Sequence, residues 1–276
     1  MLTNMPVQGV PILECRICGA GARLFDTVDL HKNCNVDSGH FQEKSGINVD
    51  YYRCCCCGFI FTDFFDRFSV EDFRREIYND DYIKVDPLYN YTRPKRNAAF
   101  LDRILDATFF RDRGAHILDY GAGSGLLSAF IEEPCRIVSY DPMCPKYSSF
   151  PEEKFELIFS SEVIEHTVHP KKIVEDWANL LDRNGIVIFS TQLQPDNIDA
   201  IKGAWWYIGP RNGHVSIFSS ESLTRALAGC GLRCETLSSE WHIAYRGHFP
   251  THLDRAKLKL LAEEISTGFV PVGANV

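Results

Sequence analysis

The stretch "HILDYGAGSG" (residues 116–125) decides the fold. It begins as an apolar strand, closes on Asp119 and Tyr120, and then places a glycine at every second position. Glycine lets the backbone turn tightly and come close to a ligand, and the N-terminus of a following helix attracts anionic groups. The next segment, "LLSAFIEE" (126–133), has the pattern of an amphipathic helix. We therefore expect a strand, a ligand-binding turn and a helix in this order.

Strands and helices continue to alternate after this unit. The expected strands are "RIVSYDP" (136–142), "FELIFSSEVIEH" (155–166) and "GIVIFSTQL" (185–193), and the expected helix is "HPKKIVEDWANLL" (169–181). Such alternation is typical of a mostly parallel, doubly wound α/β sheet. Sheets of this type bind their ligands at the carboxyl ends of the strands.

An aspartate at the end of the second strand indicates the class of ligand. Asp141 lies 16 residues beyond Gly125, where a carboxylate can accept hydrogen bonds from both hydroxyls of a ribose. A glycine turn alone is weak evidence. Together with an acidic strand end at this distance, it predicts an adenosyl ligand.

These motifs resemble those of the class I S-adenosylmethionine-dependent methyltransferases. "ILDYGAGSG" is similar to the first motif of that family, "VSYDP" to its ribose-binding strand end, and "FELIFSSEVIEHTVHP" to the fourth-strand motif of its small-molecule branch. Residues 219–247 fit the helix and two strands that close the family's sheet. The resemblance covers residues 78–247 and implies a Rossmann-like sheet of seven strands.

The resemblance also implies which residues bind S-adenosylmethionine. They are Asp119, Gly121, Ala122, Gly123 and Asp141, with Ser160 and Glu162 lining the far side. Asp119 has a simpler interpretation as a turn former at the strand end. An NAD-dependent reductase with the same sheet is disfavoured, because the third glycine stands in the wrong place for it.

One segment departs from the family pattern. Only 13 residues, "PMCPKYSSFPEEK", separate Asp141 from Phe155, where the family normally fits a helix and a further strand. We expect the sheet to lose an edge strand there, and the residue that contacts adenine cannot be assigned. The short segment also leaves open a non-catalytic adenosyl-binding protein.

Two cysteine motifs precede the sheet. "CRICG" (15–19) and "CCCCG" (54–58) both end in Cys-x-x-Cys-Gly, the form of a zinc knuckle. Four thiolates leave no open position for a substrate, so the expected role is a structural zinc site. The alternative is ordinary free thiols. The expected ligands are Cys15, Cys18, Cys54 and Cys57, with His31, Cys34 and His40 as spare ligands, and Cys55 and Cys56 as bystanders.

Four regions are expected. They are a zinc-binding module (1–70), a helical connector that covers the cleft (71–114), the methyltransferase domain (115–248), and a C-terminal helix and tail (249–276). Some bacterial methyltransferases carry a similar pair of knuckles and a tyrosine-rich connector. Tyr91 and Arg93 of the connector either cap the carboxylate of the methyl donor or are solvated.

Acid–base chemistry is expected from "EVIEH" (162–166) and from His214. Three interpretations remain open. His166 or His214, with Glu165, is the general base of an O- or N-methylation; or these side chains only shape the pocket; or they bind magnesium together with Glu162, as in methyltransferases that modify the 3′ ends of small RNAs. "KGAWWYIGPRNGHVS" (202–216) is expected to form a substrate lid or a hydrophobic plug, with Trp205, Trp206 and Tyr207 supplying apolar area.

Charge and composition limit the partners. The chain has 276 residues, 45% of them hydrophobic, and a formal net charge of −8, which argues against nucleic acid as a partner. We read no signal peptide and no membrane span, and expect a cytoplasmic protein. The sequence predicts a zinc-stapled methyltransferase of a small-molecule acceptor. An RNA methyltransferase that uses the zinc ribbon to bind RNA is the alternative.

Overall fold

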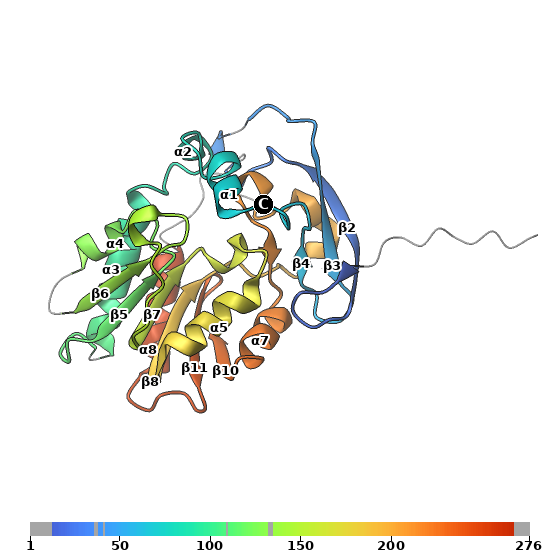
Figure 1. Ribbon diagram of the computed structural model, residues 1–276. Helices are drawn as coiled ribbons and strands as arrows, with labels where there is room; N and C mark the ends of the chain where they lie inside the picture. The colour runs from blue at the N-terminus through green and yellow to red at the C-terminus, as the bar shows by residue number, and fades with distance from the viewer. Residues whose placement is uncertain (1–12, 36–37, 41, 109, 132–134, 268–276) are drawn as a thin grey trace, which may run out of the picture.

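The computed structural model describes residues 13–35, 38–40, 42–108, 110–131 and 135–267. Its larger sheet has six strands in the order β10-β11-β8-β7-β5-β6 (Figure 1). Strands β5, β6, β7 and β8 are parallel, and β11 runs antiparallel to both β8 and β10. The bounds are β5 His116–Tyr120, β6 Arg136–Tyr140, β7 Phe155–Ser161, β8 Leu181–Ser190, β10 Leu232–Thr236 and β11 Trp241–Arg246.

The sheet has six strands within the described residues and not seven. The segment between β6 and β7 contains only a short 3-10 helix, η2 (Pro145–Tyr147), where the family pattern has a helix and a strand. The shortening thus falls after Asp141, as the length of that segment predicts. The antiparallel pair β10–β11 after α7 (Ser220–Ala228) confirms the expected helix, strand and strand.

Helices cover both faces of this sheet (Figure 1). On one face, α3 (Thr92–Ala107), α4 (Leu126–Phe130) and α8 (Arg255–Thr267) pack over a core that contains Ile117 and Phe159. On the other, α5 (Pro170–Leu180) and α7 pack over Leu118 and Ile158. Neighbouring residues of one strand enter opposite cores because side chains alternate along a strand. All four apolar residues expected on the connector helix are buried: Ala98, Leu101, Ile104 and Leu105.

Several expected boundaries shift. The helix expected over 126–133 ends at Phe130, and residues 132–133 lie outside the described part of the chain. The strand expected over 155–166 ends at Ser161 because Glu162 adopts a left-handed φ of 54°, which breaks the ladder. The 3-10 helix η3 (Ile164–His166) follows. Strand β8 begins at Leu181, four residues before the expected start at Gly185.

A second, antiparallel sheet is built mainly from the N-terminal region. Its order is β1-β2-β3-β4-β9, with β1 Leu13–Glu14, β2 Gly21–Asp29, β3 Asn48–Cys54, β4 Ile60–Phe61 and β9 Ser216–Ile217. The last strand belongs to the loop region after β8, which also contains α6 (Ile198–Ile201), η4 (Lys202–Ala204) and η5 (Pro210–Asn212). The two halves of the chain therefore share one sheet.

The connector reaches the carboxyl ends of the parallel strands. Its first helix, α1 (Val70–Glu76), begins with a capping box between Ser69 and Asp72. Arg74 on this helix donates hydrogen bonds to the carbonyls of Pro142 and Met143, just after β6. The short helix α2 (Tyr82–Val85) follows, and both helices lie above the larger sheet in Figure 1. No helix in the described ranges is long and apolar enough to cross a membrane.

Candidate active site

The glycine turn after β5 forms a close contact with the end of β6. Gly121, Gly123 and Gly125 all have positive φ, at 84°, 54° and 73°. The Gly123 N–H donates to Oδ2 of Asp141 at 2.7 Å, and the Met143 N–H donates to Oδ1 at 2.7 Å. Each oxygen keeps a lone pair for a further donor. The predicted glycine turn and ribose carboxylate are therefore neighbours.

Two buried polar groups beside this turn have an atom without a partner. Oδ2 of Asp119 and Oγ of Ser160 make no hydrogen bond among the described residues. Each lies one residue before the carboxyl end of its strand, Asp119 on β5 and Ser160 on the adjacent β7, at the edge where ligands bind. Burial, and then the charge of Asp141, raises the pKa of Asp119 to about 7. An adenosyl ligand that offers hydroxyl and amino donors fits such a donor-poor site.

Gly121→Ala is expected to destabilise the protein by about 2 kcal/mol, because a side chain at positive φ is strained and the site is crowded. An added Cβ would lie 2.3 Å from Cγ2 of Val163. Gly231→Ala is the matched control, with a φ of 74° and nothing within 4 Å of the added Cβ. Urea denaturation should show the larger loss for Gly121→Ala. Equal losses in the two variants would show that the contact with Val163 does not matter.

The two connector residues proposed for the carboxylate of the donor have different surroundings. Arg93 makes a two-pronged ion pair with the buried Asp86, at 2.8 and 3.0 Å. Burial alone would lower the pKa of Arg93, but the charges of Asp86 and Glu162 raise it. Tyr91 is 55% exposed and packs edge-on against Phe130. Arg93 thus lies among buried charges, whereas Tyr91 lies at the surface.

Three of the predicted acid–base residues come together. One ligand atom from each of Glu165, His166 and His214 lies within 4.8 Å of the others. Glu165 and His166 come from η3, and His214 from the loop just before β9. The Val215 N–H donates to the Glu165 carbonyl at 2.9 Å, which ties the two segments together. This group of three side chains could hold a metal ion.

Burial sets the protonation of this group. Burial, with the repulsion of Arg93, lowers the pKa of His166 to about 4. Burial also lowers the pKa of His214 well below its usual value. The pKa of Glu165 rises well above the ordinary range because of burial and the charge of Glu162. Both imidazoles are therefore neutral at pH 7, and each keeps one unprotonated ring nitrogen.

Glu162 lies beside this group but is not part of it. Its Oε1 accepts a hydrogen bond from Ser190 at 3.2 Å, and its Oε2 lies 3.4 Å from the Tyr207 hydroxyl. Burial raises the pKa of Glu162 despite the opposing charge of Arg93. The structure therefore unites three members of the expected magnesium quartet and links the fourth through Tyr207.

Sequence reasoning did not give Tyr207 its role. Its hydroxyl donates to Oε1 of Glu165 at 2.7 Å, and its backbone carbonyl lies 2.8 Å from Nδ1 of His214. Tyr207 is fully buried, whereas Trp206 is 37% exposed. The "WWY" run (205–207) indicated an apolar plug or lid but not a hydrogen bond to a carboxylate.

The four predicted zinc ligands converge in the N-terminal module. Sγ of Cys15 lies 3.6 Å from Sγ of Cys57, and Sγ of Cys18 lies 3.4 Å from Sγ of Cys54. All four sulfurs lie within 4.8 Å of one another, and no disulfide joins them. The Ile17 N–H points at Cys15 Sγ at 3.4 Å, as a knuckle requires. These residues could hold one metal ion.

The spare ligands are not at this centre. Cys34 Sγ lies 3.4 Å from Nδ1 of His214. His31 contacts the backbone carbonyl of Glu43 at 2.7 Å. The metal group found among the described residues of the module contains neither of these nor His40. Cys55 and Cys56 are exposed and lie outside the group, as expected of bystanders.

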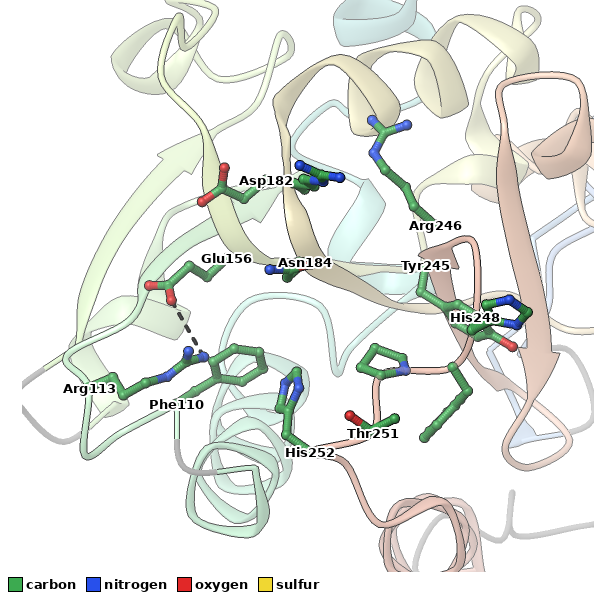
Figure 2. Close-up of a pocket in the computed structure, with 14 residues that line it drawn as sticks. Phe110, Arg113, Glu156, Asp182, Asn184, Tyr245, Arg246, His248, Thr251 and His252 are labelled. Carbon is green, nitrogen blue, oxygen red and sulfur yellow. Dashed lines mark ion pairs between the residues drawn. The ribbon is translucent and has the colours of Figure 1, made fainter.

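A cavity of about 620 Å³ lies at the other end of the larger sheet (Figure 2). Its lining includes Asp182 and Asn184 at the start of β8, and an ion pair of 3.5 Å between Arg113 and Glu156. None of the predicted site residues lines it. Because α/β sheets bind ligands at the carboxyl ends of their strands, we place the active site at the glycine turn and not in this cavity.

Comparison with known families identifies the domain to which this part of the chain belongs. Residues 89–237, more than half of the chain, match the family described as "Methyltransferase domain". The chain belongs to this methyltransferase domain family. The matched range contains the glycine turn, Asp141, η3 and His214. It excludes the four cysteines of the N-terminal module.

Several solved structures are similar to this methyltransferase-domain chain. The mitomycin 7-O-methyltransferase MmcR is 14% identical, with 65% of this chain and 61% of that chain covered and a TM-score of 0.46. The O-methyltransferase NcsB1 from neocarzinostatin biosynthesis, in complex with S-adenosyl-L-homocysteine and 1,4-dihydroxy-2-naphthoic acid, is 16% identical, with 60% and 61% covered and a TM-score of 0.41.

An O-methyltransferase family 2 protein from Planctomyces limnophilus, in complex with apigenin, is 14% identical, with 48% of this chain and 50% of that chain covered and a TM-score of 0.40. The chain spans less than two thirds of the length of each of these three structures. A comparison with curated proteins finds no match.

Proposed function

We propose that the protein is an S-adenosylmethionine-dependent methyltransferase that acts on a small-molecule acceptor. The observation that carries this proposal is the glycine turn joined to Asp141, within a range that matches the methyltransferase domain family. The net charge of −8 favours a small molecule over a nucleic acid as acceptor.

The residues at the carboxyl ends of β5, β6 and β7 would hold the donor, which supplies a methyl group on a sulfonium. Asp141 would accept hydrogen bonds from the ribose hydroxyls, and the positive-φ glycines would let the backbone lie against the ligand. Asp119 and Ser160 have unpartnered oxygens that face the same edge. Gly121, Ala122 and Gly123 supply the turn. Glu162 and Arg93 supply half-buried ionisable groups nearby, and Tyr91 lies at the surface.

The protein's main task in such a displacement is to align the acceptor and exclude water. Where the acceptor must lose a proton, a neutral imidazole beside the bound acceptor can take it. His214 is buried and His166 is half-buried, both imidazoles are neutral, and Glu165 lies beside them. We therefore assign the general base of an O- or N-methylation to this group of three side chains.

We further propose that Cys15, Cys18, Cys54 and Cys57 bind one structural zinc ion. Four cysteine sulfurs within 4.8 Å of one another, and a knuckle N–H directed at sulfur, fit tetrahedral zinc. A closed site of this kind stabilises the module and leaves no position for a substrate.

Asp141→Ala is expected to weaken binding of S-adenosylhomocysteine by at least about 100-fold, because it removes a half-buried carboxylate that orders the glycine turn. Isothermal titration calorimetry of wild type and variant measures this. The matched control is Asp182→Ala, an exposed carboxylate at the other end of the sheet, which should bind as the wild type does. No binding by the wild type would overturn the proposed function. Binding without methyl transfer to any acceptor in a broad panel would favour a non-catalytic adenosyl-binding protein.

A further inference from the structure

We propose that the N-terminal module is a working part of the active site, because it holds in place the loop that carries His214. This inference rests on the proposed function only for the role of His214. The contacts that carry it are independent of any methyl donor. A domain that was only appended to the chain would not require contacts with this loop.

The first contact is a shared sheet. Strand β4 of the module pairs with β9, with Ile60 opposite Ile217 and Phe61 opposite Ser216. The pairing continues for one more bond, from the Thr62 N–H to the Val215 carbonyl at 3.2 Å. His214 is the residue immediately before Val215. The backbone beside this histidine is therefore fixed by the module.

The second contact is a buried hydrogen bond to His214 itself. The hydroxyl of Tyr51, on β3, donates to the His214 carbonyl at 2.7 Å. Tyr51 is fully buried. Loss of this donor would leave a carbonyl buried without that hydrogen bond, which costs more than an exposed one. The ring of Tyr51 also packs with Tyr207 and Ile217 in one apolar cluster.

The third contact comes from the loop after β2. The Cys34 N–H donates to Oδ1 of Asn212 at 2.7 Å, and the Arg211 N–H donates to the Lys32 carbonyl at 3.1 Å. The ammonium group of Lys32 donates to the Trp205 carbonyl at 3.0 Å and also to the carbonyl of Ile208. The module thus binds the 205–214 loop at both of its ends.

The conformation in which the module holds this loop decides which nitrogen of His214 can accept a proton. Nδ1 lies 2.8 Å from the Tyr207 carbonyl, and a carbonyl can only accept a hydrogen bond. Nδ1 therefore carries the proton, and Nε2 keeps its lone pair. The hydroxyl of the same Tyr207 donates to Glu165. Tyr51 and Tyr207 are positioning residues: they act through His214 and Glu165.

Nitrogen-15 NMR of the imidazoles at pH 7 tests the inference without an acceptor. We expect wild-type His214, assigned by comparison with His214→Asn, to give the shifts of one Nδ1–H tautomer. Tyr51→Phe should release the loop, so that the Nε2–H tautomer of His214 reaches about 10% or more of the population. It would be seen either as a second set of signals or as averaged shifts. An Nε2–H tautomer in the wild type would overturn the inference.

Tyr52→Phe is the matched control. Tyr52 is the next residue on the same strand and is also buried, but its hydroxyl makes no hydrogen bond among the described residues. We expect its His214 signals to equal those of the wild type. Identical His214 signals in Tyr51→Phe and Tyr52→Phe would refute a positioning role for the module. Binding of S-adenosylhomocysteine should be unchanged in both variants, so failure of the donor site and failure of this inference give different results.

Discussion

Cys57→Ser is expected to lose the bound zinc and unfold the N-terminal module, whereas Cys55→Ser and Cys56→Ser are expected to do neither. Cys57 Sγ lies within the group of four sulfurs, and the side chain is 2% exposed. Zinc binding stabilises small four-ligand sites by about 10–16 kcal/mol. Removal of one thiolate should therefore cost most of this stabilisation.

The run of four cysteines provides its own controls. Cys55 and Cys56 are exposed, and Cys55 donates through Sγ to the Gly21 carbonyl at 2.7 Å. Elemental analysis should find about one zinc per chain in the wild type, Cys55→Ser and Cys56→Ser, and much less in Cys57→Ser. A stably folded wild type without metal would contradict the zinc assignment. Because β4 and β9 are paired, Cys57→Ser should also disturb the His214 signals.

The larger sheet was predictable because its signals are local. Strand β5 reads as an apolar run that ends in aspartate and glycine, and α5 shows helical spacing of apolar residues. The missing edge strand was predictable from length alone, since 13 residues leave room for little more than η2. The end of β7 was not, because the left-handed backbone of Glu162 has no signature in its residue type.

The arrangement of the candidate site was predictable where one motif carries it and unpredictable where two distant segments meet. The turn at Gly121 and the pair in "EVIEH" follow from short motifs. The bond from Tyr51 to His214 joins residues 163 positions apart, and β4 and β9 have two residues each, too few for any periodicity. Their pairing depends on the packing of the whole molecule, so the sequence showed the module and the loop as separate features.

Asp119→Asn is expected to stabilise the protein relative to wild type, and increasingly so as the pH rises. The pKa of Asp119 is raised to about 7 in the folded state, against about 3.9 in an unfolded chain. The folded state therefore holds this proton more tightly, and wild-type stability falls as the pH rises between these two values. Asparagine cannot ionise, so the variant lacks this loss.

The difference between variant and wild type should grow by about 3 kcal/mol from pH 5 to pH 8, since two pH units lie between pH 5 and the folded pKa. Urea denaturation at the two pH values measures it. Asp182→Asn, at an exposed carboxylate, is the control and should show no such growth. A difference between Asp119→Asn and wild type that does not change with pH would show that the carboxylate is not destabilised by burial.

The same variant separates the two interpretations of Asp119. A carboxylate that destabilises the fold near neutral pH is explained if it binds a ligand, because buried groups that lower stability are characteristic of functional sites. If Asp119 only forms a turn, Asp119→Asn should bind S-adenosylhomocysteine as tightly as the wild type and be the more stable protein. If Asp119 accepts a hydrogen bond from the donor through its unpartnered Oδ2, the variant should bind at least about 10-fold more weakly. Higher stability together with weaker binding would then identify Asp119 as a residue kept for ligand binding at the expense of the fold.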